Sequence, residues 1–169
     1  ALANELYKKG GSYANIDVLN DAVQEFINQI VFLRICEDRN LPLYHSLQEN
    51  IKDKENLHSE LEKMFKAADK RYNSGLFERN KIIFDLDNEI IKKIVEGLYY
   101  PQSPYLFNII APNMLGKMYE MFLTEELFIS DGRVTLRKKK DSKNRSIVTT
   151  PDEIVRYMSS KTMKELCID

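Results

Sequence analysis

The sequence predicts a mainly α-helical fold: a helical bundle of four or more helices, then a short C-terminal β-hairpin with a loop, and a final helix. Apolar residues recur at three- and four-residue steps through several segments before residue 127, which is the period of an amphipathic helix. Strand signals occur only in short stretches after that point. Near the C-terminus, Thr150-Pro151-Asp152-Glu153 carries the residue types that begin a helix. At 169 residues, the chain is long enough to bury a core.

The first predicted helix covers residues 15–39. Its apolar residues are spaced to form one stripe, and they are Ile16, Leu19, Val23, Phe26, Ile27, Ile30 and Leu33. The second half adds Val31, Phe32, Ile35 and Cys36, so that Arg34 interrupts a surface that is otherwise apolar on nearly every side. A helix of this kind belongs inside a bundle. Asn40 and Pro42 predict where it ends.

Three further helices are expected at residues 54–72, 87–99 and 112–127, each with one apolar face. We therefore expect residues 1–127 to form one helical domain, and residues 128–169 to be the first segment of a second. The core of the helical domain should include Phe26, Ile30, Leu33, Phe122 and Leu123.

The pattern changes after residue 127. Short strands are expected at 128–129 and 134–136, joined by Asp131-Gly132, a dipeptide that favours hairpins. A further strand is possible at 146–149. The final helix follows, with Thr150 as its cap, Pro151 in the first helical position and Glu153 completing a capping box.

The net charge is −1, so the fold as a whole has no electrostatic footprint for nucleic acid. Cations are concentrated in one segment, where residues 133–145 carry seven of them against one acid. Two interpretations stay open: a solvated, flexible loop, or a weak, salt-sensitive contact with DNA phosphates. The residues that would make this contact are Arg137, Lys138, Lys139, Lys140, Lys143 and Arg145.

The composition also predicts the compartment. No secretory signal accompanies Cys36 and Cys167, which are far apart and expected to be free thiols. No apolar run approaches the roughly 20 residues of a membrane span, so we expect a cytoplasmic protein without a membrane contact. Because the Cys and His residues show no paired spacing, no metal site is expected.

Two charged clusters have a structural and a catalytic interpretation. Arg34 and Asp38 are four residues apart on the first helix, and with Glu37 and Arg39 they are expected to form a partly buried ion-pair network that ties this helix to its neighbours. Asp85 and Asp87 resemble a nuclease carboxylate cluster. They are more simply explained as caps of the helix that follows, since no strand pair is predicted there.

Four motifs occur in an order that resembles one family. Residues 31–41 are similar to a Phe-Leu-Arg-x-x-Glu-Asp-Arg-Gly-Leu segment, and residues 72–77 to a Tyr-Asn-Gly-Gly-Leu-Phe turn. Residues 98–123 are similar to a longer motif that contains Ser-Pro-Tyr-x-Phe and Leu-Gly-x-x-Tyr-Glu-x-Phe-Leu, and residues 146–155 to Gly-x-Tyr-Tyr-Thr-Pro-x-x-Ile-Val. The family is that of type IIG restriction–modification enzymes, fused endonuclease–methyltransferases, and their adenine-N6 DNA methyltransferase relatives.

The resemblance implies a role for the Thr-Pro turn. Thr149, Thr150 and Pro151 match the family's turn beside S-adenosylmethionine, although Ser146 replaces the family's glycine and Val148-Thr149 its paired tyrosines. A helix N-terminus offers free amide donors to an anion such as the cofactor carboxylate. An ordinary capped helix remains the alternative.

The resemblance also implies what this chain is. The cofactor loop and the Asn-Pro-Pro-Tyr type motif of the family come further along than Asp169, so we expect a piece of a longer protein. That piece would be a helical connector domain and the start of a methyltransferase domain, catalytically inactive and without cofactor by itself. Its partners would be the neighbouring nuclease and methyltransferase domains, and DNA through the parent protein.

Two other classes of function stay open. One is a helical protein-interaction module of a DNA-defence protein without methyltransferase activity. The other is a DNA-binding helical domain, which would need cations along one helix face, whereas the predicted helices mix acids and bases.

Overall fold

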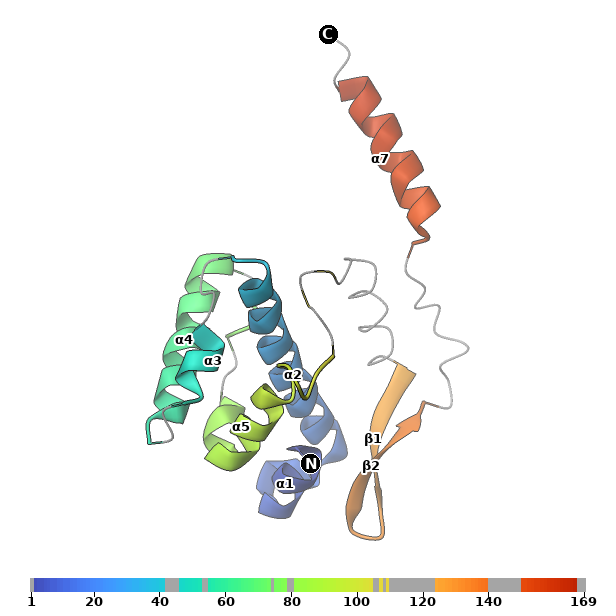
Figure 1. Ribbon diagram of the computed structural model, residues 1–169. Helices are drawn as coiled ribbons and strands as arrows, with labels where there is room; N and C mark the ends of the chain where they lie inside the picture. Colours follow the sequence, from blue (N-terminus) through green and yellow to red (C-terminus); the bar gives the residue numbers. More distant parts are fainter. Residues whose placement is uncertain are drawn as a thin grey trace. The chain divides into compact units, whose positions relative to one another are not determined.

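The computed structural model describes residues 2–41, 46–52, 55–73, 75–78, 81–104, 107, 109, 124–139 and 150–166. Within these residues the chain is mainly helical, with one two-stranded hairpin and a C-terminal helix, which confirms the predicted fold class (Figure 1). In chain order the elements are α1 (Leu2–Lys9), the 3-10 helix η1 (Gly11–Ala14), α2 (Ile16–Asp38), α3 (Ser46–Asn50), α4 (Leu57–Tyr72), the 3-10 helix η2 (Lys81–Asp85), α5 (Asn88–Glu96), β1 (Glu125–Ser130), β2 (Arg133–Lys138) and α7 (Asp152–Leu166).

The chain divides into two compact units. One comprises residues 1–109 and 127–136, and the other comprises residues 110–126 and 137–169. Helices α1 to α5 lie in the first unit, and α7 lies in the second. The expected domain boundary between residues 127 and 128 falls within β1, and it stays a prediction.

Helix α2 packs against α1, η1, α3 and η2, so the first unit is organised around it. Asn15 caps its start, because its Oδ1 accepts the amide N–H groups of Asp17 and Val18 at 2.9 and 3.4 Å. At the other end, Asn40 adopts φ 51°, and the N–H of Leu41 donates to the carbonyl of Cys36 at 2.9 Å. This left-handed closure ends the helix where the sequence predicted.

The core lies between α2 and the elements around it. The predicted core residues Phe26, Ile30 and Leu33 are buried, together with side chains from α1, α3, α4, η2 and α5. Phe122 and Leu123 lie outside the described residues, as does most of the helix expected at 112–127.

The structure differs from the prediction at several element boundaries. Helix α5 ends at Glu96 rather than Tyr99, and residues 97–99 form a turn. The helix expected to reach Leu127 is wrong over its last residues, because β1 begins at Glu125. Leu127 and Ile129 face the core there while Phe128 is exposed, and that alternation is the period of a strand. Helix α1, whose Leu2 and Leu6 are buried, was not predicted.

The hairpin β1–β2 has the predicted turn. Asp131 and Gly132 both have positive φ, 51° and 71°, as a two-residue type I′ turn requires. At the far end, the N–H of Lys139 donates to the carbonyl of Thr124 at 2.9 Å. Leu127 and Val134 are buried against the core cluster.

Helix α7 begins one residue later than predicted. The carbonyl of Pro151 accepts the N–H groups of Ile154 and Val155 at 2.9 and 3.1 Å, so Pro151 is the N-cap residue and Asp152 the first helical one. No described residue hydrogen-bonds the Thr150 side chain, and the expected capping box is not formed. Asp152 and Glu153 instead place negative charge at the positive end of the helix.

We predict that Leu33→Ala destabilises the chain by about 2–5 kcal/mol, because the 1% exposed side chain would leave a cavity in the core. Chemical denaturation of the 169-residue chain measures this effect. Val18→Ala is the matched control on the same helix, since Val18 is 42% exposed, and it should change stability by no more than about 0.5 kcal/mol. A cost for Leu33→Ala as small as that of the control would contradict the packing described.

Candidate functional site at the end of helix α2

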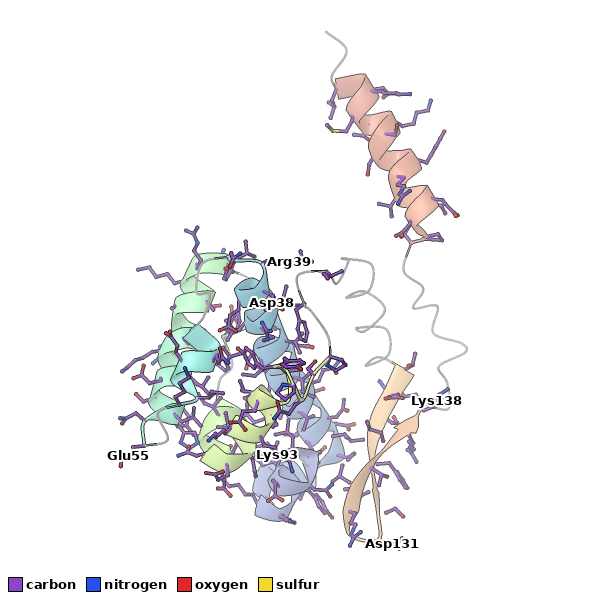
Figure 2. The ribbon with its side chains drawn as sticks, viewed as in Figure 1. Asp38, Arg39, Glu55, Lys93, Asp131 and Lys138 are labelled. Carbon is purple, nitrogen blue, oxygen red and sulfur yellow. The ribbon has the colours of Figure 1, made fainter. Side chains whose placement is uncertain are left out.

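The last turns of α2 carry three charged side chains away from solvent. Arg34, Glu37 and Asp38 lie three and four residues apart, so that the helix itself brings them together. Their side chains are 9%, 4% and 19% exposed. Figure 2 labels Asp38 and Arg39, which mark this end of the helix.

The Arg34 guanidinium is the centre of the cluster. Its Nη1 forms an ion pair with Asp38 Oδ1 and lies 3.8 Å from Glu37 Oε2, and its Nε donates to the carbonyl of Leu98 at 3.2 Å. The guanidinium carbon lies 4.1 Å from the centroid of the Tyr99 ring and 5.3 Å from that of Phe107. Arg34 therefore combines charge pairing with cation–π contacts, for which its planar group is suited.

Glu37 connects α2 to two other segments. Its Oε1 accepts the N–H of Leu47 at 2.7 Å and that of Gln48 at 3.4 Å, both near the start of α3. Its Oε2 accepts the hydroxyl of Tyr99. A carboxylate at this place satisfies amide donors that a short helix leaves free.

Asp38 adds a third segment, because its Oδ2 accepts the N–H of Phe107 at 2.9 Å. The end of α2 thus holds α3, the turn after α5 and the segment at residue 107 through side chains spaced three and four residues apart. Both carboxylates use their oxygens for donors of the protein itself, which suits a group that fixes segments in place. We call Arg34, Glu37, Asp38, Tyr99 and Phe107 the α2-end network.

The pKa of the Tyr99 hydroxyl is raised by its surroundings. Desolvation raises the pKa of its hydroxyl well above the ordinary range, and the hydrogen bond to Glu37 and the negative charge of Glu37 raise it further. The phenol therefore stays protonated and keeps donating to Glu37.

The expected ion-pair network is thus present around Arg34, Glu37 and Asp38. Arg39, the fourth predicted member, is the exposed C-cap residue of α2. Sequence reasoning did not assign Tyr99 and Phe107 to this network, because they lie more than 60 residues away in the chain. Aromatic residues beside Pro101 and Pro104 are the available signal in the sequence, but a local pattern does not say which distant helix they contact.

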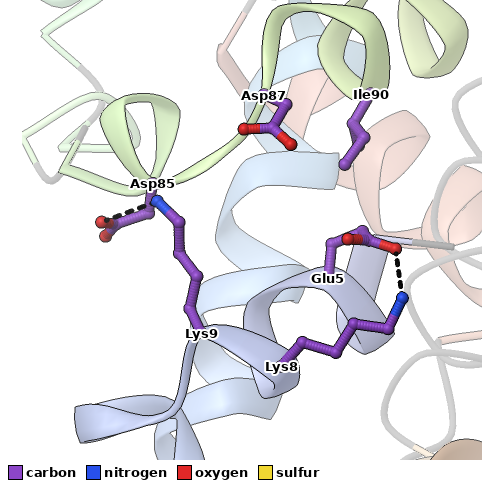
Figure 3. A pocket seen from close by; sticks show the side chains of 6 residues that line it. All are labelled: Glu5, Lys8, Lys9, Asp85, Asp87 and Ile90. Atoms are coloured by element: carbon purple, nitrogen blue, oxygen red, sulfur yellow. Dashed lines mark hydrogen bonds and ion pairs between the residues drawn. The ribbon is translucent and has the colours of Figure 1, made fainter.

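A second charged group lines a small pocket between α1, η2 and the start of α5 (Figure 3). Lys9 Nζ lies 3.7 Å from Asp85 Oδ1, and the Tyr13 hydroxyl donates to Asp85 Oδ2 at 2.6 Å. Asp85 therefore joins η2 to the N-terminal helices rather than capping α5. Asp87 is the N-cap residue of α5, as expected, although its side chain forms no cap hydrogen bond. The expected capping role is wrong for Asp85 alone.

The expected DNA-binding residues lie only partly within the described chain. Arg137 and Lys138 belong to β2, where Arg137 Nε pairs with Glu126 Oε1 at 2.8 Å, and Lys139 directly follows the strand. Lys140, Lys143 and Arg145 lie outside the described residues. Of the expected cofactor turn, Thr150 and Pro151 are exposed ahead of α7, and Thr149 lies outside the described residues.

In the part of the chain that the structure describes, no three His, Cys, Asp or Glu side chains are grouped as metal ligands. His58 is half-buried, with its Nε2 2.7 Å from the Leu86 carbonyl oxygen. Among the described helices, none has both the length and the apolar character that crossing a membrane requires.

The chain is similar to a segment of a much longer protein, the type II restriction enzyme and methyltransferase RM.Eco57I of Escherichia coli. The two sequences are 43% identical over 152 residues, which cover 88% of this chain and 15% of that protein. The chain therefore shares ancestry with part of a restriction and methyltransferase protein. No family model matches the chain. No solved structure matches it either.

We predict that Arg34→Ala destabilises the chain by about 3–5 kcal/mol, because it leaves two largely buried carboxylates without their cation. Lys66→Ala is the matched control. It also breaks an ion pair between residues four apart, with Glu62 at 2.7 Å, but the Lys66 side chain is 67% exposed. Its cost should stay below about 1 kcal/mol. Equal costs in chemical denaturation would show that the α2-end network holds nothing together.

The raised pKa of Tyr99 predicts a loss of stability at high pH. Below pH 10 the phenol is protonated in both states, and above it the unfolded chain releases the proton first. Stability should therefore fall by about 1.4 kcal/mol per pH unit for this group. Tyr99→Phe should make the alkaline decline shallower, by about 1.4 kcal/mol in total between pH 9 and 11, because the unfolded phenol is only partly ionised over that range. Denaturation experiments at several pH values measure this difference.

Tyr100→Phe is the control for removal of an exposed hydroxyl, since Tyr100 is 88% exposed. The partly buried Tyr13 and Tyr72 keep part of the decline in both variants, because desolvation also raises their pKa values, that of Tyr72 to about 12. An unchanged slope in Tyr99→Phe would contradict the assignment of the buried phenol.

Proposed function

We propose that this chain is the helical connector and the first methyltransferase segment of a type IIG restriction–modification enzyme that methylates adenine N6 in DNA. The observation that carries the proposal is the 43% identity to RM.Eco57I over 88% of the chain. The order of the four sequence motifs supports it. Because the chain spans 15% of the length of that relative, the activity belongs to a longer protein.

The connector positions the domains on either side of it and takes no part in the chemistry. Helix α2 has 23 residues, about 35 Å of stiff structure at 1.5 Å per residue. The α2-end network fixes three later segments to one end of this helix. A rigid element of this kind can hold a nuclease at a set distance from a methylating domain.

S-adenosylmethionine binds to the parent protein with Thr149, Thr150 and Pro151 near its carboxylate. The exposed N-terminus of α7 supports this proposal, since its first amides point away from the helix and carry partial positive charge. The cations that follow β2, from Lys139 onward, contact DNA phosphates weakly in the same protein.

The test of the proposal is methyl transfer by the full-length protein of which this chain is a segment. Incubation with labelled S-adenosylmethionine and adenine-containing duplex DNA should label the adenine N6 position. Failure to label DNA, in a protein that is folded, would favour the interaction module of a DNA-defence protein instead. The isolated 169-residue chain should transfer no methyl group and cleave no DNA.

We predict that Thr150→Asp lowers the affinity of the full-length protein for S-adenosylmethionine, because it places a carboxylate against the cofactor carboxylate. The Thr150→Ala variant should bind S-adenosylmethionine more tightly than the Thr150→Asp variant does, since alanine adds no charge. Calorimetric titration of the cofactor measures both, with melting of each variant as the control for folding. Equal affinity of the Asp variant and the unmodified protein would remove the Thr-Pro turn from the cofactor site.

A further inference from the structure

The register of the hairpin decides which backbone groups of β2 point away from β1. The turn at Asp131-Gly132 and the bond from Lys139 to Thr124 set the pairing. In an antiparallel pair, alternate residues direct their N–H and C=O groups to opposite sides. Arg133, Thr135 and Arg137 face β1, and the outer edge is formed by the backbone groups of Val134, Leu136 and Lys138.

At Val134 this outer edge already has a partner. The Asn4 side chain donates from Nδ2 to the Val134 carbonyl at 3.1 Å and accepts the Val134 N–H at Oδ1, 2.8 Å away. A carboxamide has the donor and acceptor of a peptide group, so Asn4 stands where the backbone of a third strand would. At this residue the edge therefore presents its donor and acceptor in the orientation that a peptide group needs.

The same edge continues without a partner among the described residues at Leu136 and Lys138. Leu136 lies on the face of the hairpin that buries Val134, yet it is 66% exposed. Charge is divided between the strands: β2 and Lys139 carry four cations and no acid, whereas β1 carries Glu125 and Glu126. The edge thus combines an apolar side chain and positive charge with backbone donors and acceptors that no described residue pairs with.

We propose that the outer edge of β2 at Leu136 and Lys138 binds an extended acidic segment of the parent polypeptide as a third strand. An added strand satisfies both donors and acceptors, whereas a phosphate would satisfy only the donors. Acidic side chains complement the cations of β2. This inference rests on the proposed function, under which most of the polypeptide lies outside this chain, and a tethered segment reaches the edge at high effective concentration.

Residue-resolved hydrogen exchange of the full-length protein tests the proposal. The amides of Leu136 and Lys138 should exchange on the order of 100-fold more slowly than unprotected amides. Leu136→Pro removes one donor but is tolerated on an edge whose N–H faces solvent, so it should abolish the protection of Lys138 and leave the hairpin folded. Leu136→Ala is the matched control that keeps the amide and should keep Lys138 protected. Lys138→Glu should weaken the protection of Leu136.

Four results would overturn the inference. Exchange of both amides at the unprotected rate would mean that the edge binds no strand and that Lys138 only discourages pairing with another chain. Protection that appears only with added duplex DNA would assign the edge to nucleic acid. Protection that grows with protein concentration would assign it to a second molecule. Equal protection in Lys138→Glu would remove the acidic character of the partner.

Methyl transfer by the same preparation separates this inference from the proposed function. A protein that methylates DNA with an unprotected edge would overturn the strand pairing alone. A protected edge in a folded protein that does not methylate would overturn the proposed function and leave the strand pairing standing.

Discussion

The burial of Arg34 is the constraint on which the arrangement of the first unit depends. A guanidinium that is 9% exposed must have its charge and its donors satisfied within the protein. Glu37 and Asp38 supply the charge, and the carbonyl of Leu98 accepts from Nε. Each carboxylate in turn accepts hydrogen bonds from segments that follow in the chain. The packing of those segments is consequently tied to the end of α2.

The first unit contains a second contact between distant segments, which is made by an amide side chain and not by charged groups. Asn4 joins α1 to β2 through two hydrogen bonds that imitate a peptide group, across 130 residues of sequence. Both contacts join early helices to residues that follow much later. A unit whose distant segments are tied by directional polar contacts keeps one geometry, because these contacts lose their strength when segments slip. Apolar packing alone tolerates such slippage better.

This organisation fits the structural role that we propose for the chain. The charged groups of the α2-end network are used within the protein, and the pocket between α1, η2 and α5 holds paired lysines and acids at its surface. The similarity to part of a restriction enzyme and methyltransferase indicates common ancestry with that part. Under the proposed function, other domains carry out the chemistry and this one sets the distance between them.

The sequence by itself determined the helical class, the course of α2, the I′ turn of the hairpin and the pairing of Arg34 with Asp38, since each depends on residues within a few positions of one another. It could not predict that the rings of Tyr99 and Phe107 contact Arg34. Nor could it predict that Asn4 hydrogen-bonds the backbone of Val134, or that Asp85 accepts a hydrogen bond from Tyr13. Those contacts form between residues 60 to 130 positions apart. Periodicity along the chain carries no information about such pairs, and only the tertiary packing decided them.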